Sequence, residues 1–83
     1  MKFNDAILKI LNKKYDPDTM IDLRYKTYDL SLKIDKDGNA ILLFMGKRNE
    51  QGVVKGERYA RTLKYNQDGT VLKDHWELKG KAT

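Results

Sequence analysis

The side chains that most enzymes use for chemistry are scarce in this sequence. It contains no cysteine, one serine (Ser31) and one histidine (His75). Nucleophilic catalysis needs a nucleophile, a base within hydrogen-bond reach of it and a third group that orients the base. Ser31 lies in the middle of a strand-like segment, and His75 beside Trp76 is typical of a surface residue on another strand. We therefore predict that the protein is not an enzyme.

Motifs for metals and cofactors are absent as well. Asp35, Asp37 and Asn39 have the spacing of the first three ligands of a calcium loop, but Ala40 and Gly46 stand where that loop needs a glycine and a glutamate. One histidine without cysteine is too few ligands for a zinc cage. No glycine-rich phosphate-binding loop is present. We expect a hairpin turn here, with no metal and no cofactor.

Basic side chains remain as candidates for a binding function. The net charge is +5, to which residues 1–46 contribute +1 (eight basic less seven acidic) and residues 47–83 contribute +4 (nine less five). A basic half indicates either an anionic partner or a surface kept soluble by its charge.

The register of the last hairpin decides which face these cations occupy. Asp68-Gly69 is typical of a two-residue hairpin loop. That loop pairs Tyr65 with Leu72, Leu63 with Asp74, Arg61 with Trp76 and Tyr59 with Leu78, all on one face. A three-residue loop with a bulge at Gly69 would instead pair Tyr65 with Val71 and Leu63 with Lys73, which mixes the faces. Because the hydrophobic pattern fixes register, we favour the two-residue loop.

The first of these faces is apolar except for Arg61 and Asp74. In the favoured register these two side chains are diagonal neighbours, which predicts an ion pair. Arg61 also stands opposite Trp76, an arrangement that suits a cation–π contact.

The other face of the hairpin is basic. Lys64 stands opposite Lys73, Thr62 stands opposite His75, and Arg58 lies near Lys79. Like charges opposed on a sheet are destabilising, so this strip indicates an anionic partner; flexible lysines on a solvated face also splay apart at little cost. The candidate binding residues are therefore Arg58, Lys64, Lys73, His75 and Lys79, with Lys47 and Arg48 on a glycine-bearing connection nearby.

The first fifteen residues predict one amphipathic helix. Asn4 is a good N-cap, and Phe3 and Leu8 have the spacing of a hydrophobic staple. Apolar residues then recur at three- and four-residue steps, which gives one apolar stripe. We expect Asp16-Pro17 to end the helix, because the residue before proline is pushed out of the α region.

From Met20 the apolar residues alternate with polar ones, as in strands. Their set moves from odd to even positions between Tyr25 and Tyr28. This indicates either a β-bulge near Lys26-Thr27 or two strands that meet there; we favour a bulge or bend in one long strand. The later strands are predicted at Ala40–Met45, Glu57–Tyr65 and Thr70–Leu78.

These elements predict an α+β fold, with the N-terminal helix packed on a four-stranded antiparallel β-meander, or on a five-stranded one if the first strand splits. Residues 1–83 are expected to form a single compact domain. No apolar run reaches the length of a membrane span, and the N-terminus lacks the pattern of a signal peptide. We expect a cytoplasmic protein that does not engage a membrane.

Three segments of the second half resemble a family of small uncharacterised bacterial proteins. They are Gly56-Glu57-Arg58-Tyr59-Ala60-Arg61, Lys73-Asp74-His75-Trp76 and Lys79-Gly80-Lys81. The resemblance implies a soluble, stand-alone domain of the bacterial cytoplasm. It implies no known activity and no binding residue.

Two functions are compatible with these features. The first is a small non-catalytic protein-interaction module, which binds a partner protein or associates with itself through an open sheet edge. The second is a binder of nucleic acid or another anion through the basic strip, with affinity that falls steeply as salt rises.

Overall fold

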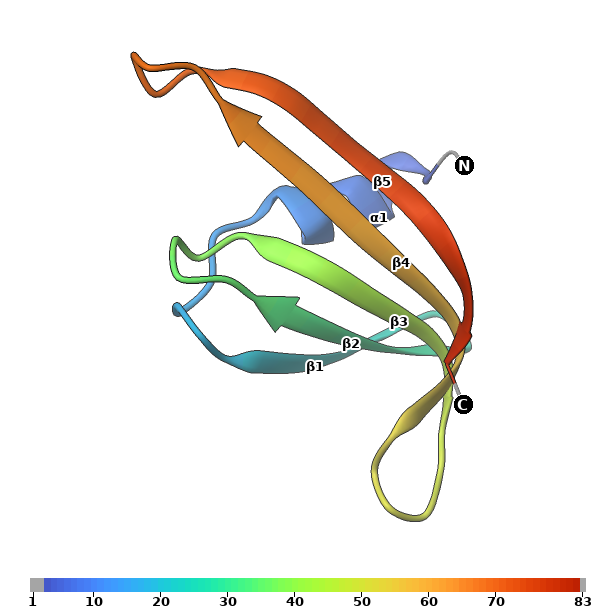
Figure 1. Ribbon diagram of the computed structural model, residues 1–83. Coiled ribbons are helices and arrows are strands. Elements are labelled where there is room, and N and C mark those ends of the chain that lie inside the picture. Colours follow the sequence, from blue (N-terminus) through green and yellow to red (C-terminus); the bar gives the residue numbers. More distant parts are fainter. Residues whose placement is uncertain (1–2, 83) are drawn as a thin grey trace.

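The computed structural model describes residues 3–82. One helix, α1 (Asp5–Asn12), precedes a five-stranded antiparallel sheet whose strands follow one another in chain order. The strands are β1 (Met20–Tyr25), β2 (Tyr28–Ile34), β3 (Ala40–Arg48), β4 (Val54–Tyr65) and β5 (Val71–Ala82). The sheet is curved, and α1 lies against one of its faces (Figure 1). The prediction of one helix with an antiparallel sheet is confirmed, and the sheet has the larger of the two strand numbers.

The helix begins where the sequence predicts and ends earlier. The Asn4 side chain accepts a hydrogen bond from the backbone N–H of Ile7 at 2.9 Å, which satisfies one of the free donors of the first turn. Lys13 already has extended backbone angles, so the helix ends at Asn12 and not at Asp16-Pro17. The Tyr15 hydroxyl donates to the carbonyl of Ile10 at 2.7 Å, which supplies a side-chain partner for the helix end.

The change of hydrophobic phase after Tyr25 marks a turn between two strands, so the favoured prediction of one bent strand is wrong. Tyr25 pairs directly with Tyr28, and Lys26 takes a positive φ of 54°. Tight hairpin turns require such left-handed angles, and a non-glycine residue can adopt them. β1 and β2 therefore keep their apolar residues on the same face.

The last hairpin combines both registers that the sequence left open. Tyr65 pairs with Val71 across a three-residue loop, so the predicted pairing of Tyr65 with Leu72 is wrong. A bulge at Leu72 then restores the favoured register, and Leu63 pairs with Asp74. From there to the pair of Tyr59 with Leu78, the register is as predicted.

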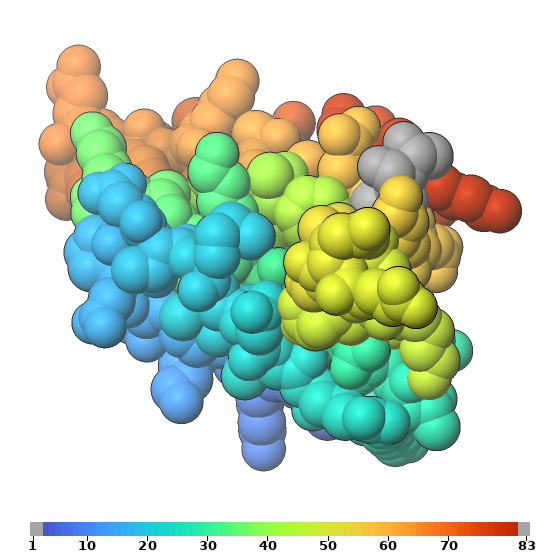
Figure 2. Space-filling view, turned by 90° about the horizontal axis from the view of Figure 1, so that it is seen from below, coloured from blue at the N-terminus to red at the C-terminus, as the bar shows by residue number. Residues whose placement is uncertain are grey.

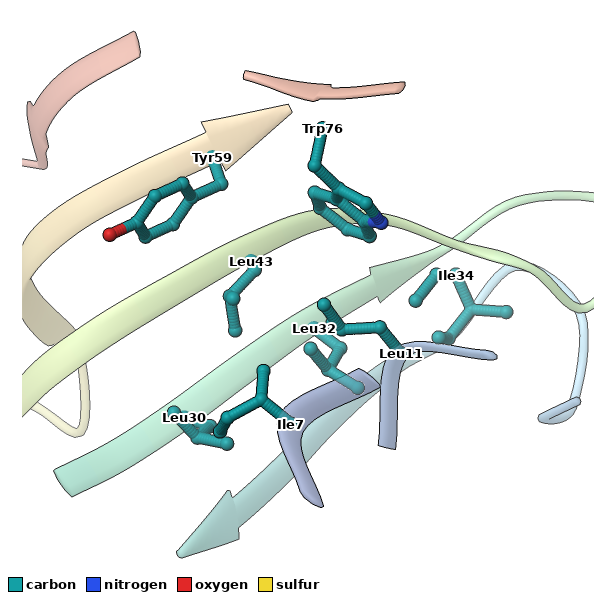
Figure 3. Close-up of a cluster of buried hydrophobic side chains, with 9 residues drawn as sticks. Ile7, Leu11, Leu30, Leu32, Ile34, Leu43, Tyr59 and Trp76 are labelled. Atoms are coloured by element: carbon teal, nitrogen blue, oxygen red, sulfur yellow. The ribbon is translucent and has the colours of Figure 1, made fainter. Parts of the chain in front are cut away.

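A cluster of buried side chains lies between the helix and the covered face of the sheet. Figure 3 shows its members, which point toward one another from the helix and from four strands. They are Ile7, Leu11, Leu30, Leu32, Ile34, Ala40, Leu43, Tyr59 and Trp76. The ring of Phe3 meets Tyr59 and Trp76 edge-on, at centroid distances of 5.0 and 6.0 Å. Aromatic rings prefer this geometry, because the positive edge of one ring meets the negative face of the other.

Arg61 is the polar centre of this covered face. Its side chain is only 7% exposed, and all five of its N–H donors have acceptors. Two of the donors form a forked ion pair with the Asp74 carboxylate at 2.7 and 2.8 Å. The other acceptors are the carbonyls of Leu11 and Ala40 and the side chain of Asn12, at 3.1 to 3.2 Å. One guanidinium therefore joins the end of α1 to β3, β4 and β5.

Both predicted contacts of Arg61 are confirmed. The forked pair with Asp74 is the expected diagonal ion pair, and the guanidinium carbon lies 5.5 Å from the centre of the Trp76 ring. The hydrogen bonds from Arg61 lower the pKa of Asp74, and its positive charge adds to this, while partial burial of the carboxyl opposes it.

We expect Arg61→Met to lower the free energy of unfolding by about 2–4 kcal/mol, because it strands the Asp74 carboxylate and two carbonyls without their donor. Urea denaturation measures this loss. Arg58→Met is the matched control on the same strand: Arg58 is exposed, so its loss should cost no more than about 0.5 kcal/mol. Equal effects of the two changes would contradict the role assigned to Arg61.

The lowered pKa of Asp74 predicts a specific acid sensitivity. Its carboxylate stabilises the fold above the pKa of an unfolded aspartate, about 3.9, and this contribution is lost as pH falls through the lower pKa of the folded state. The difference in unfolding free energy between the wild type and Asp74→Asn should therefore shrink as pH is lowered from about 6 to about 3. A difference that stays constant over this range would contradict the assignment.

Candidate functional site

The open face of the β4–β5 hairpin carries four of the five residues of the predicted strip, Arg58, Lys64, Lys73 and His75, and we call these four the basic strip; the fifth, Lys79, lies at a bulge. Lys64 pairs directly with Lys73, as predicted, and both side chains are exposed. Thr62 pairs with exposed His75, also as predicted.

The strip is interrupted in its middle by an acidic residue. Glu77 pairs with Ala60, between the lysine pair and Arg58. Its carboxylate lies 3.3 Å from Nζ of Lys79, which is therefore neutralised by its neighbour on the same strand. A second bulge, at Lys79, makes Arg58 pair with Gly80. The cations of the strip thus form two separate groups.

Lys47 and Arg48, predicted on a glycine-bearing connection, are instead the last two residues of β3 and lie outside this strip, because the strand continues past Met45. Lys47 donates from Nζ to the carbonyl of Thr27, in the turn between β1 and β2. Arg48 donates to the carbonyl of Gly52 at 2.6 Å and lies 3.3 Å from the Asp22 carboxylate. Both side chains hold the β3–β4 hairpin to its neighbours, which is a structural role.

The β3–β4 hairpin bends sharply where Gly46 pairs with Gly56. A Cβ atom on Gly46 would lie 1.9 Å from the carbonyl oxygen of Lys55, and one on Gly56 would lie 2.2 Å from that of Met45. No side chain fits at such distances, so only a pair of glycines permits the two backbones to approach this closely. The sequence places these two glycines ten residues apart, and this spacing was the available signal for the bend.

Asp29 fixes the chain just after the bend. Its carboxylate accepts a hydrogen bond from the backbone N–H of Arg48 at 2.9 Å. This bond is the main cause that lowers the pKa of Asp29, and the nearby cations Arg24, Arg48 and Lys47 lower it further. The tip of the hairpin is consequently held beside β1 and β2, where Figure 2 shows it in yellow next to the cyan and green strands.

A cleft of about 640 Å³ lies between this hairpin tip and the open face of the sheet, and we call it the hairpin cleft. Its apolar lining consists of Met20, Phe44, Val53 and Val54. Its polar lining consists of Asp22, Ser31, Arg58 and Lys81, and Gly52 completes the wall. Volumes of this order are typical of sites for small ligands, which combine an apolar lining with a few charged groups.

The charges of the hairpin cleft leave two cations available. Asp22 lies beside Arg48, whereas Arg58 and Lys81 are exposed and form no ion pair among residues 3–82. Arg58 was predicted as a binding residue; Lys81, Phe44 and Val53 were not. Sequence reasoning missed them because they come together only when the hairpin folds back at its glycine pair.

Within residues 3–82 no three His, Asp or Glu side chains are grouped in a way that would hold a metal ion. The same part of the chain has no helix that is long and apolar enough to cross a membrane. No protein-family model, no characterised protein and no solved structure matches this chain significantly. The resemblance to small bacterial proteins therefore stays a prediction.

Gly46→Ala should deform the bend and the hairpin cleft with it, at a cost of about 1–3 kcal/mol for the forced steric overlap. Amide chemical shifts should change at Phe44, Ser31 and Met20 on the cleft walls. Gly69→Ala is the control, because Gly69 has a left-handed φ of 87° but nothing within 4 Å of an added Cβ. Its shift changes should stay within the β4–β5 loop. If the amide shift changes in Gly46→Ala were confined to residues next to Gly46, the cleft would not depend on the bend.

Proposed function

We propose that this protein is a non-catalytic binding module whose hairpin cleft receives a carboxylate carried on an apolar body. The observation that supports this most directly is the cleft itself, in which exposed Arg58 and Lys81 stand beside Phe44, Met20 and Val53. Arginine and lysine bind carboxylates through charge-assisted hydrogen bonds, and the apolar wall gains from covering a hydrophobic group.

A partner protein is our first choice for the source of this carboxylate. A protein supplies it as a chain end or an acidic side chain next to apolar residues, and a free organic acid supplies the same chemistry. The apolar stripe of α1 serves the opposite side of the sheet, where Ile7 and Leu11 are buried in the core cluster. The helix therefore does not cover the open face of the sheet, and that face is accessible to a ligand.

We also propose that the protein acts in the bacterial cytoplasm. The absence of cysteine is compatible with a reducing compartment, and the resemblance to small bacterial proteins supports the same location. Ser31 and His75, the one serine and the one histidine, lie on β2 and β5 with two strands between them, which supports a binding role over a catalytic one.

A nucleic acid is the second candidate ligand, and the lysine pair favours it. Lys64 and Lys73 face each other at the price of mutual repulsion, which a phosphate between them would relieve. Against this candidate, Tyr59 and Trp76 are buried in the core and offer no stacking surface beside the strip.

The test is an amide NMR titration with octanoate, with a short peptide that ends in a leucine carboxylate, and with single-stranded RNA. Octanamide and the amidated peptide are the uncharged controls. We expect either acid to shift Phe44, Val53, Arg58 and Lys81, and the double variant Arg58→Gln/Lys81→Gln to weaken binding about tenfold or more. The better of the two acids identifies the source of the carboxylate.

Lys64→Gln/Lys73→Gln removes the same number of charges from the other cationic group and should leave acid binding unchanged. Equal binding of the acids and their uncharged controls would overturn the proposal. RNA binding that is lost only in Lys64→Gln/Lys73→Gln would establish the second candidate in its place.

A further inference from the structure

β5 forms an open edge of the sheet along its whole length. It is the last strand in the sheet order, and among residues 3–82 it pairs with β4 alone. In Figure 1 no strand lies beyond it, and the start of α1 passes behind it. A free edge exposes a row of backbone N–H and C=O groups that readily pair with another strand. Bulges, charged side chains and proline commonly protect such edges. β5 carries two bulges and several charges, but the stretch Lys73–Leu78 between the bulges is regular and contains no proline, so its outward backbone groups stay available for pairing.

The edge also exposes apolar side chains that the core does not use. Leu72, the bulged residue just before the regular stretch, is 66% exposed, and Leu78, the last residue of the stretch, is 42% exposed. Both belong to a strand whose central Trp76 is buried. A partner that lies along this edge would cover both leucines.

We propose that β5 pairs with β5 of a second copy of this chain, antiparallel and in the register that places His75 opposite His75 of that copy. In a two-fold symmetric sheet some residue must face its own copy, so few registers are possible. Centring the pair on His75 places Lys73 opposite Glu77 of the second copy, and this contact occurs twice. It also brings Leu72 beside Leu78 of the second copy, again twice.

The symmetric registers centred on residues next to His75 place like charges opposite one another. A pair centred on Lys73, Asp74 or Glu77 places that charge against itself. A pair centred on Trp76 places Lys73 against Lys79 of the second copy. Opposite charges stabilise cross-strand neighbours, and like charges destabilise them. Among the registers centred from Lys73 to Glu77, only the His75 register opposes opposite charges without opposing like ones. A pair centred on Leu78 would also oppose Glu77 to Lys79, but its centre lies against the bulge at Lys79.

This dimer would continue the sheet across the two-fold axis and leave both open faces on the same side. The two hairpin clefts would then face the same direction, so that one assembly presents two binding sites. The proposal stands on the β5 edge and does not depend on what the cleft binds.

Charge reversal tests the register directly. Sedimentation equilibrium of the wild type at rising concentration, at about 0.15 M salt, should show a monomer–dimer equilibrium. In the Lys73→Glu variant, each of the two contacts places the new glutamate opposite Glu77 of the second copy. In the Glu77→Lys variant, each contact places the new lysine opposite Lys73 of the second copy. Each single variant should raise the dimer dissociation constant about tenfold or more. Neither change touches the core. Lys73→Glu removes the repulsion from Lys64 within the same chain, whereas Glu77→Lys replaces the exposed ion pair with Lys79 by a repulsion that is present in monomer and dimer alike.

Two further samples should restore the opposite-charge contacts and with them the dimer. The double variant Lys73→Glu/Glu77→Lys should dimerise as the wild type does, because both contacts are again between opposite charges. An equal mixture of the two single variants should form heterodimers for the same reason. Lys36→Glu changes the net charge as much as Lys73→Glu does, but Lys36 is exposed in the loop between β2 and β3, so this variant should leave dimerisation unchanged.

The proposal is overturned if the wild type stays monomeric at millimolar concentration. It is also overturned if the single variants dimerise as well as the wild type, or if their mixture does not associate. Circular dichroism and urea denaturation of each variant distinguish a lost interface from a lost fold.

Discussion

The guanidinium of Arg61 holds together parts of the chain that the strand ladder leaves separate. The ladder joins the strands to one another but makes no bond to α1, an eight-residue helix. Arg61 donates to the last helical turn, to β3 and to β5, and its charge is balanced by Asp74. A buried charge is tolerated only when all of its donors are satisfied. The position of the helix on the covered face therefore depends on this contact together with the packing of Ile7 and Leu11 in the core.

The open face is shaped by a different constraint, the close approach of two backbones at Gly46 and Gly56. The bend lets the hairpin tip fold beside β1 and β2, where Arg48 and Asp29 hold it. A flat continuation of β3 and β4 would leave Phe44 and Arg58 on an open surface. The bend places the hairpin tip opposite Phe44 and Arg58 and so forms the cleft. The candidate site therefore depends on Gly46 and Gly56, which have no side chains.

Much of the covered face could be predicted from the sequence, because it depends on local rules. The N-cap at Asn4 follows from side-chain chemistry, and the pairing of Arg61 with Trp76 follows from a two-residue period counted from a turn. The errors lie at places where two local rules compete. Lys26 has a left-handed φ angle that its residue type does not predict. The loop at Asp68-Gly69 has three residues in place of the predicted two, and the bulge at Leu72 restores the predicted register beyond it.

The sequence by itself determined the periodicity of the elements, the scarcity of cysteine, serine and histidine, and the opposition of Lys64 to Lys73. Each of these depends on residues close in the chain or on a count of residue types. Only the tertiary structure decided that Arg48 is a clamp, that Lys81 joins Arg58 at a cleft, and that Glu77 divides the basic strip. These features depend on how sharply the β3–β4 hairpin bends. The close contact of the Gly46 and Gly56 backbones sets this bend, and a hydrophobic periodicity does not predict such a contact.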